Sequence, residues 1–161
     1  MSWSRRGLLG LAILPLAGCF RPMLAEDAPA AGLLGKVELP EIQGRFGYFL
    51  VKSLEDRLGR PNGPEYRLSV ETDISERGLA VAQDNSVTRV TLVAEAKWKL
   101  WREGQNQPVL SDTAVTQSGY GATSSLYATR QTRRDIERRL ARDLGERIAR
   151  AVLAQAGQFS S

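Results

Sequence analysis

Two stretches of the chain alternate apolar and polar residues with a period of two. In "EYRLSVETDI", residues 65–74, the apolar face is Tyr66, Leu68, Val70, Thr72 and Ile74. The other stretch, "SVTRVTLVAEAKWKLW", residues 86–101, would extend for roughly 50 Å at about 3.3 Å per residue. A period of two predicts strands with one buried and one solvated face. The face of the longer strand predicted to be buried consists of Val90, Leu92, Ala94, Ala96, Trp98 and Leu100.

Two further stretches repeat their apolar residues every three to four positions, which predicts amphipathic helices. One spans residues 45–60, where Gly59 and a following proline supply the stop signal. The other begins at Ser124 or Ser125, either a suitable N-cap, and runs to about Ala156. The apolar stripes are Phe46, Leu50, Leu54 and Leu58 in the first helix and Ile136, Leu140, Leu144, Ile148 and Val152 in the second.

The remaining segments complete a sheet. Residues 36–40, "KVELP", predict a short first strand that the proline ends. Residues 102–108 have turn composition, and residues 109–120 predict a further strand that forms a hairpin with the long one. Because a sheet with one solvated face must cover the other, the two helices provide that cover. The sequence therefore predicts an α+β two-layer sandwich, with a mostly antiparallel sheet of about four strands covered by two helices in the order β-α-β-β-β-α.

The amino terminus has the layout of a bacterial lipoprotein signal. Arg5 and Arg6 precede an apolar run that is shorter than the about 20 residues needed by a transmembrane helix. The run ends in "LAGC": a branched aliphatic residue, two small residues and Cys19, the one cysteine of the chain. We therefore expect a signal peptide over residues 1–18, cleavage after Gly18, and a diacylglycerol on the Cys19 thiol together with an amide-linked acyl chain. An ordinary signal peptide, or a buried helix with a chance cysteine, is the alternative interpretation.

The mature chain is then expected to have two parts. Residues 19–35, rich in Ala, Gly and Pro, form a lipid-anchored linker, and residues 36–161 form one α+β domain. The paired arginines also suit twin-arginine export, so that route and general secretion both stay open. Phe20 follows the cysteine, whereas aspartate there favours inner-membrane retention in the lipoprotein sorting scheme that this resembles. The expected location is the periplasmic side of the outer membrane.

Composition narrows the class of function. The 161 residues are enough for one hydrophobic core without disulfides. The chain contains no histidine and no G-x-S-x-G motif, and its cysteine is assigned to lipid, so we expect neither an enzyme nor a metal site. No cofactor is expected beyond the covalent lipid on Cys19. The formal net charge of +4 is small and scattered, which argues against a nucleic-acid partner.

The polar face of the long strand holds candidate binding residues. Arg89, Lys97 and Lys99 are either solubility charges or contacts for the phosphates of an anionic amphiphile. Trp98 belongs to the apolar face and is expected in the core. Trp101 falls on the opposite face near the strand end, where an indole is a candidate for contact with a partner or a membrane interface.

The last helix is rich in arginine. Such a run is usually a solvated helix face, and the alternative is a surface that binds lipid phosphates or an acidic partner. Both interpretations stay open. The arginines are Arg130, Arg133, Arg134, Arg138, Arg139, Arg142, Arg147 and Arg150.

The order of short motifs along the chain resembles the LptE family of lipopolysaccharide-assembly lipoproteins, in its alphaproteobacterial form. The resemblance covers nearly the whole chain and starts with the signal and the lipidation motif. The further motifs that carry it are "FRP" at 20–22, "LEDRLG" at 54–59, "YRLSV" at 66–70, "SGY" at 118–120 and "SLYAT" at 125–129.

This resemblance implies a protein anchored in the outer membrane and seated inside the β-barrel LptD. It implies a role in assembling that barrel and in delivering lipopolysaccharide to the outer leaflet. Arg89, Lys97 and Lys99 are then candidates for contact with lipopolysaccharide, and Trp101 for contact with the partner. The alternatives are a lipid-anchored accessory protein of another envelope complex without lipopolysaccharide contact, and a small periplasmic carrier of an apolar ligand.

Overall fold

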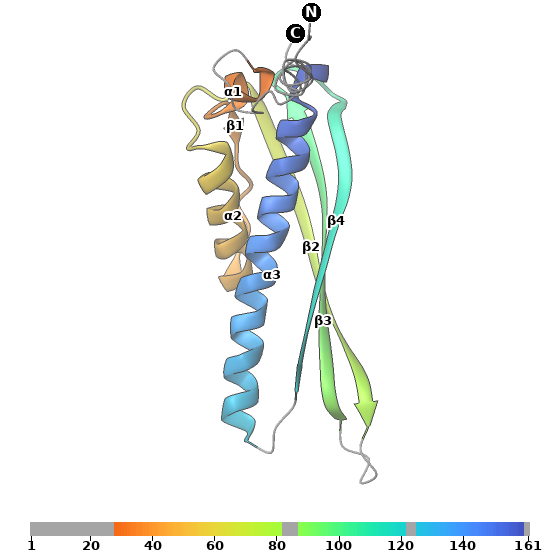
Figure 1. Ribbon diagram of the computed structural model, residues 1–161. Coiled ribbons are helices and arrows are strands. Elements are labelled where there is room, and N and C mark those ends of the chain that lie inside the picture. The colour runs from red at the N-terminus through yellow and green to blue at the C-terminus, as the bar shows by residue number, and fades with distance from the viewer. Residues whose placement is uncertain (1–27, 82–86, 122–124, 160–161) are drawn as a thin grey trace, which may run out of the picture.

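The predicted α+β fold is confirmed by a computed structural model, which describes residues 28–81, 87–121 and 125–159. A four-stranded sheet forms one layer and helices form the other, and the molecule is long and narrow (Figure 1). The expected signal peptide over 1–18, its cleavage site at Gly18, and Cys19 with its lipid lie outside the described residues.

The sheet has the strand order β1-β2-β3-β4. Its strands are β1 (Val37–Glu38), β2 (Tyr66–Val81), β3 (Val87–Arg102) and β4 (Pro108–Gly121). β1 pairs parallel to β2, and the other two pairs are antiparallel, as expected for a mostly antiparallel sheet. The turn between β3 and β4 contains Gly104 at φ 77°, so the predicted hairpin is present.

β2 is longer than the alternation predicts. The pattern ends at Ile74, whereas the strand continues to Val81 and keeps its pairing with β3, with register shifts between Gly78 and Val81. Residues 75–78, "SERG", are polar on both faces and carry no period-two signal. Pairing with a long neighbouring strand therefore extends β2 where its own sequence gives no indication.

The main helices lie close to their predicted positions. α2 (Gly44–Leu58) ends at Gly59, which adopts φ 81° and donates its backbone N–H to the Glu55 carbonyl at 2.9 Å. This left-handed conformation favours glycine and explains why the predicted stop signal works. α3 (Leu126–Ala154) begins after Ser125, whose hydroxyl accepts the Ala128 N–H at 3.3 Å.

Part of the segment expected to be linker is folded. Residues 29–33 form a short helix, α1 (Pro29–Leu33), and Ala30 and Leu33 are buried. α1 packs against the short 3₁₀ helix η2 (Ala156–Gln158) that follows α3. The structure therefore places the start of the folded part at α1 rather than at Lys36. α1 is about one turn long, so its apolar residues do not repeat often enough for a helical period to be recognised in the sequence.

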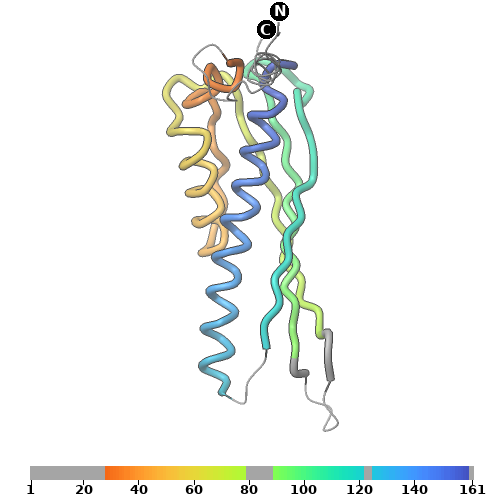
Figure 2. Tube along the Cα trace, in the orientation of Figure 1, coloured from red at the N-terminus to blue at the C-terminus, as the bar shows by residue number. Residues whose placement is uncertain are grey.

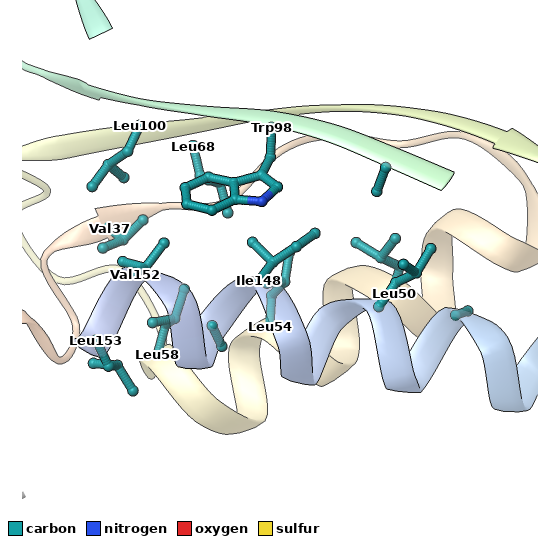
Figure 3. Packing of buried hydrophobic residues seen from close by; sticks show 14 of the residues in the cluster. Val37, Leu50, Leu54, Leu58, Leu68, Trp98, Leu100, Ile148, Val152 and Leu153 are labelled. Carbon is teal, nitrogen blue, oxygen red and sulfur yellow. The ribbon is translucent and has the colours of Figure 1, made fainter. Parts of the chain in front are cut away.

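The core lies between the helices and one face of the sheet. Figure 3 shows Trp98 of β3 between the sheet and Ile148 of α3, with Leu68 of β2 and Leu54 of α2 close by. The face of β3 predicted to be buried is buried, with relative exposures of 7% or less. All residues of both predicted helical stripes are buried except Phe46, which is partly buried and packs against the core.

α2 and α3 approach each other closely at Gly145. A Cβ atom built on Gly145 would lie 2.7 Å from the Ser53 Cβ and 2.9 Å from the Leu50 carbonyl oxygen. The Ser53 hydroxyl donates to the Arg142 carbonyl at 2.9 Å, so the contact also satisfies a buried polar group. The absence of a side chain at this position of α3 lets the helices pack at this distance.

The two main helices cover different lengths of the sheet. Figures 1 and 2 show α2 beside only one half of the strands, at the end where α1 and η2 lie, whereas α3 runs the full length. We call the end with α1 and η2 the proximal end. The opposite end, at which β2 ends and β3 begins, is the distal end. Thr72 and Ile74 of β2, predicted to be buried, are exposed because α2 does not reach them.

Candidate functional site

The outer face of the sheet, opposite the helices, carries the binding residues predicted from the sequence. Arg89, Lys97 and Lys99 are exposed on this face of β3, and Trp98, one residue from Lys97, is buried on the other. The cross-strand neighbours are mostly polar: Ser69 and Ser111 flank Lys99, and Glu71 and Thr113 flank Lys97. The outer face is therefore a solvated surface, as the alternation predicts.

The structure does not bring the three candidate cations together. Arg89 lies at the distal end of β3, opposite Gly121 of β4. Lys97 is eight residues further along the same strand, which corresponds to roughly 26 Å at about 3.3 Å per residue. Only Lys97 and Lys99 are near enough to bind one phosphate group together.

Lys97 lies in an acidic environment. It is opposite Glu71 in the strand register, and its ammonium group is 3.8 Å from a carboxylate oxygen of Glu95. A shallow hollow of about 170 Å³ is lined by these three side chains together with Thr72 and Asp73. A phosphate at Lys97 would therefore meet three carboxylates, which opposes binding of an anion there.

The same hollow contains a like-charge pair. Asp73 and Glu95 lie directly opposite each other on adjacent strands, and such pairs are destabilising. Replacing Asp73 by threonine is expected to raise the free energy of unfolding by about 0.5 kcal/mol, measured by urea denaturation. The matched control is Glu71→Thr, on the same face of β2 but opposite Lys97, where the charge pair is favourable. If Asp73→Thr is less stable than Glu71→Thr, the carboxylates do not repel as inferred.

Trp101 lies on the outer face at the proximal end of β3 and is half-buried. Its indole Nε1–H donates to the Ser69 hydroxyl at 3.3 Å, and that hydroxyl is 3.3 Å from the Lys99 carbonyl oxygen to which it donates. The indole therefore lies over β2 with its polar atom already bonded, and its ring offers the contact surface. Contact with a partner stays a prediction for this residue.

The distal end of α3 combines exposed apolar side chains with arginines. Leu126 and Tyr127 are 63% and 80% exposed. Arg130 and Arg134, one and two turns further along the helix, are exposed and form no ion pair within the described residues. The first turn of α3 has no acidic residue, so nothing in that turn neutralises the positive end of the helix dipole, and Arg130 and Arg134 add their charges in the next two turns. The resulting positive potential favours an anion.

Arg133, between these two arginines, is paired. Its guanidinium is 3.1 Å from a carboxylate oxygen of Glu76 on β2 and donates to Glu137 at 3.0 Å. The Glu137 carboxylate that accepts this bond raises the pKa of Arg133. Burial, with the charge of Glu76 as a further cause, raises the pKa of the neighbouring Tyr120. Arg133 and its neighbours therefore cover the distal end of the core. The exposed positive charge on this part of α3 comes from Arg130 and Arg134.

The charge pattern of the sequence places all the arginines of α3 in one run and does not separate these two. Arg133, Arg138 and Arg147 are neutralised by carboxylates within about one helical turn along α3, and Arg133 also by β2. The spacing of carboxylates does not identify Arg130 and Arg134 either, since Arg138 and Arg147 also lack a carboxylate four residues later and yet are paired. The hydrophobic periodicity of the helix also does not predict that Leu126 and Tyr127, at its start, are exposed.

Two larger surface grooves flank α2. One, of about 330 Å³, lies between α2 and α3, where the Arg142 guanidinium is 5.6 Å from the centre of the Phe49 ring. The other, of about 570 Å³, lies beside the β1–α2 connection and exposes Tyr48. In the described part of the chain, no helix is long and apolar enough to cross a membrane, and no three metal-binding side chains cluster.

Comparison with known proteins identifies the family. A family model described as LptE, Lipopolysaccharide-assembly, matches residues 34–152. No protein in a search of curated sequences matches the chain.

Solved structures share the fold. A protein from Caulobacter crescentus assigned as a lipoprotein has a TM-score of 0.64 at 23% identity, over 81% of this chain and 96% of that one. A minor lipoprotein from Acinetobacter baumannii has a TM-score of 0.59 at 19% identity, over 76% and 94%. The rare lipoprotein B from Shewanella oneidensis has a TM-score of 0.61 at 8% identity, over 78% and 98%.

Proposed function

The chain belongs to the LptE family of lipopolysaccharide-assembly proteins, and we propose that it is a lipid-anchored plug of the LptD β-barrel. In this role it helps to assemble the barrel and takes part in transport of lipopolysaccharide to the cell surface. The observation that carries the proposal is the family match, which extends from the residue after α1 to the last turn of α3.

The dimensions of the sheet support this role. β2 and β3 have 16 residues each, or roughly 53 Å at about 3.3 Å per residue, against about 30 Å for the hydrocarbon core of a bilayer. A barrel of this class has a polar interior. The solvated outer face of the sheet is compatible with such surroundings, and the length is sufficient to fill the barrel through the membrane.

The lipid anchor is proposed to hold the proximal end at the membrane. Cys19 precedes α1 by ten residues, a segment whose reach is limited to about 35 Å even when fully extended. The diacylglycerol and acyl chain on Cys19 would insert into the outer membrane from its periplasmic side. The distal end, with its unpaired arginines, would then point away from the anchor.

Contact with lipopolysaccharide is proposed at the distal end. Arg130 and Arg134 provide unpaired guanidinium groups for phosphates, and Tyr127 provides an exposed ring beside them. Arg89 lies at the same end on the outer face of the sheet. Lys97 and Lys99 are less suited, because carboxylates surround Lys97.

A charge-reversal comparison tests this assignment. The double variant Arg130→Glu/Arg134→Glu is expected to weaken binding of purified lipopolysaccharide about tenfold, because it removes two charge-assisted contacts. The matched variant Lys97→Glu/Lys99→Glu has the same change in net charge and is expected to bind within twofold of wild type. The measurement is a titration of the purified mature domain with fluorescent lipopolysaccharide at fixed salt. The opposite order of the two affinities would move the site to the outer face.

The plug role is tested by isolation of the full-length lipoprotein from its own membrane. A tagged chain extracted in mild detergent is expected to bring down LptD in equal amount, and depletion of the chain is expected to reduce lipopolysaccharide at the surface. If no large β-barrel protein is recovered, the plug proposal is wrong. If the barrel is recovered and surface lipopolysaccharide is unchanged on depletion, the transport role is wrong.

A further inference from the structure

β4 forms a free edge of the sheet. It pairs with β3 along its whole length, and α3 packs on its inner face. The hydrogen-bonding groups on the other side of the β4 backbone therefore have no strand partner in the described structure. Such an edge is a template for pairing with another extended chain.

The middle and distal parts of β4 lack the features that usually protect an edge. Residues 113–121, "TAVTQSGYG", contain no charge and no proline, whereas Pro108 and Asp112 are confined to the proximal part. Val115, at the centre of the strand, is 48% exposed on the outer face. A run of nine edge residues, 113–121, without charge, proline or bulge is unusual in a protein that must avoid self-association.

β2, at the other edge of the same sheet, is protected. β1 pairs with its first two residues, and its distal part has the register shifts after Gly78. Between these lie four charged residues, Glu71, Asp73, Glu76 and Arg77. The contrast within one sheet indicates that the exposure of the β4 edge is specific to that strand.

The flank of α3 above this edge is cationic. Asp143 accepts a short hydrogen bond from the Thr116 hydroxyl of β4 and a second bond, at 3.0 Å, from Arg147. Arg139 precedes Asp143 by one turn, which places it about 6 Å toward the distal end on the same side of α3. Arg139 is exposed and forms no ion pair within the described residues. A strand added to β4 would run beside this arginine.

We propose that the β4 edge binds an extended segment of the barrel partner, LptD, by strand addition. The added strand has uncharged or β-branched residues on the side that continues the outer face, next to Val115. On the side that faces α3 it has an acidic residue that pairs with Arg139. A second copy of the chain fits less well, because its own α3 would bring a second Arg139 to the same flank. This inference rests on the proposed function.

The test uses the complex isolated from membranes and measures backbone amide exchange with deuterium. Those amides of residues 113–121 that point away from β3 are expected to exchange at least tenfold more slowly in the complex than in the free mature chain, while the edge of β2 over residues 70–77 changes less than twofold. If LptD is present and the β4 amides exchange as in the free chain, strand addition is wrong. If LptD is absent, the proposed function fails first, so the two failures are distinguishable.

Two pairs of matched variants separate the edge from the flank. Val115→Lys on β4 is expected to lower recovery of LptD at least fivefold, whereas Ser75→Lys, on the same face of β2, leaves it unchanged. Arg139→Glu is expected to lower recovery similarly, whereas Arg142→Glu, on the α2 side of the same helix, does not. Each mature variant is first shown to melt within a few degrees of wild type. If Val115→Lys melts at a lower temperature than this, Val115→Thr replaces it as the variant that preserves the fold. Equal recovery across each pair, or crosslinking of β4 to a second copy of the chain, would overturn the proposal.

Discussion

Replacing Trp98 by alanine is expected to lower the free energy of unfolding by about 3 to 5 kcal/mol, the largest effect of any single substitution considered. Trp98 is 2% exposed and is the largest of the fully buried side chains. It lies between the sheet and the helices, against Ile148 and Leu68 (Figure 3). Its removal would leave a cavity between the two layers that the strands are too constrained to close. Urea denaturation of the mature domain, followed by circular dichroism, measures the change.

Trp101→Ala is the control for this prediction. The same side chain is removed from the same strand, but from the outer face, where the indole is half-buried and bonded to Ser69. The expected loss is about 1 kcal/mol, mostly from the hydrogen bond and partial burial. Equal losses for the two tryptophans would show that the helical layer does not cover β3 as described.

Replacing Gly145 by alanine is expected to destabilise the fold by about 2 kcal/mol or more, although alanine is normally favoured over glycine within a helix by about 1 kcal/mol. The added Cβ would lie within 3.0 Å of the Ser53 side chain and of the Leu50 carbonyl oxygen. Since one of these is backbone, α2 must move away from α3, which loosens the contact between them. Thermal denaturation measures the change, and a valine at position 145 is expected to have a still larger effect.

Gly32→Ala is the matched control, since Gly32 also lies within a helix but would have no neighbouring atom within 4 Å of an added Cβ. This change is expected to be neutral or to stabilise by up to about 1 kcal/mol. If Gly145→Ala is as well tolerated as Gly32→Ala, then close packing of α2 and α3 does not depend on the missing side chain.

Much of the fold could be predicted because its buried positions repeat. The alternation on β3 separates Trp98 from Trp101 correctly, and the leucines of α2 and α3 are spaced for one buried stripe. α1 and the distal part of β2 could not be predicted in this way. α1 is one turn long, and residues 75–78 are in the sheet because β3 pairs with them, not because of their own pattern.

The candidate site was less predictable than the fold. Arg89, Lys97 and Lys99 share one face of one strand, but a face extends over the whole strand and does not define a site. The acidic surroundings of Lys97 come largely from β2, far away in the sequence. Pairing across elements also decides which arginines of α3 are neutralised, as Arg133 with Glu76 shows. Contact of Arg89, Lys97 and Lys99 with lipopolysaccharide stays a prediction.

The unequal lengths of α2 and α3 give the molecule a taper. α2 and α3 both back the sheet toward the proximal end and α3 alone backs it at the distal end (Figure 1), so the molecule is narrower where it is farthest from α1. In the proposed plug, the narrow end would enter the barrel first, and the first turn of α2, which begins at Gly44, would limit how deep the molecule can go. The short helix would thus set both the direction and the depth of insertion.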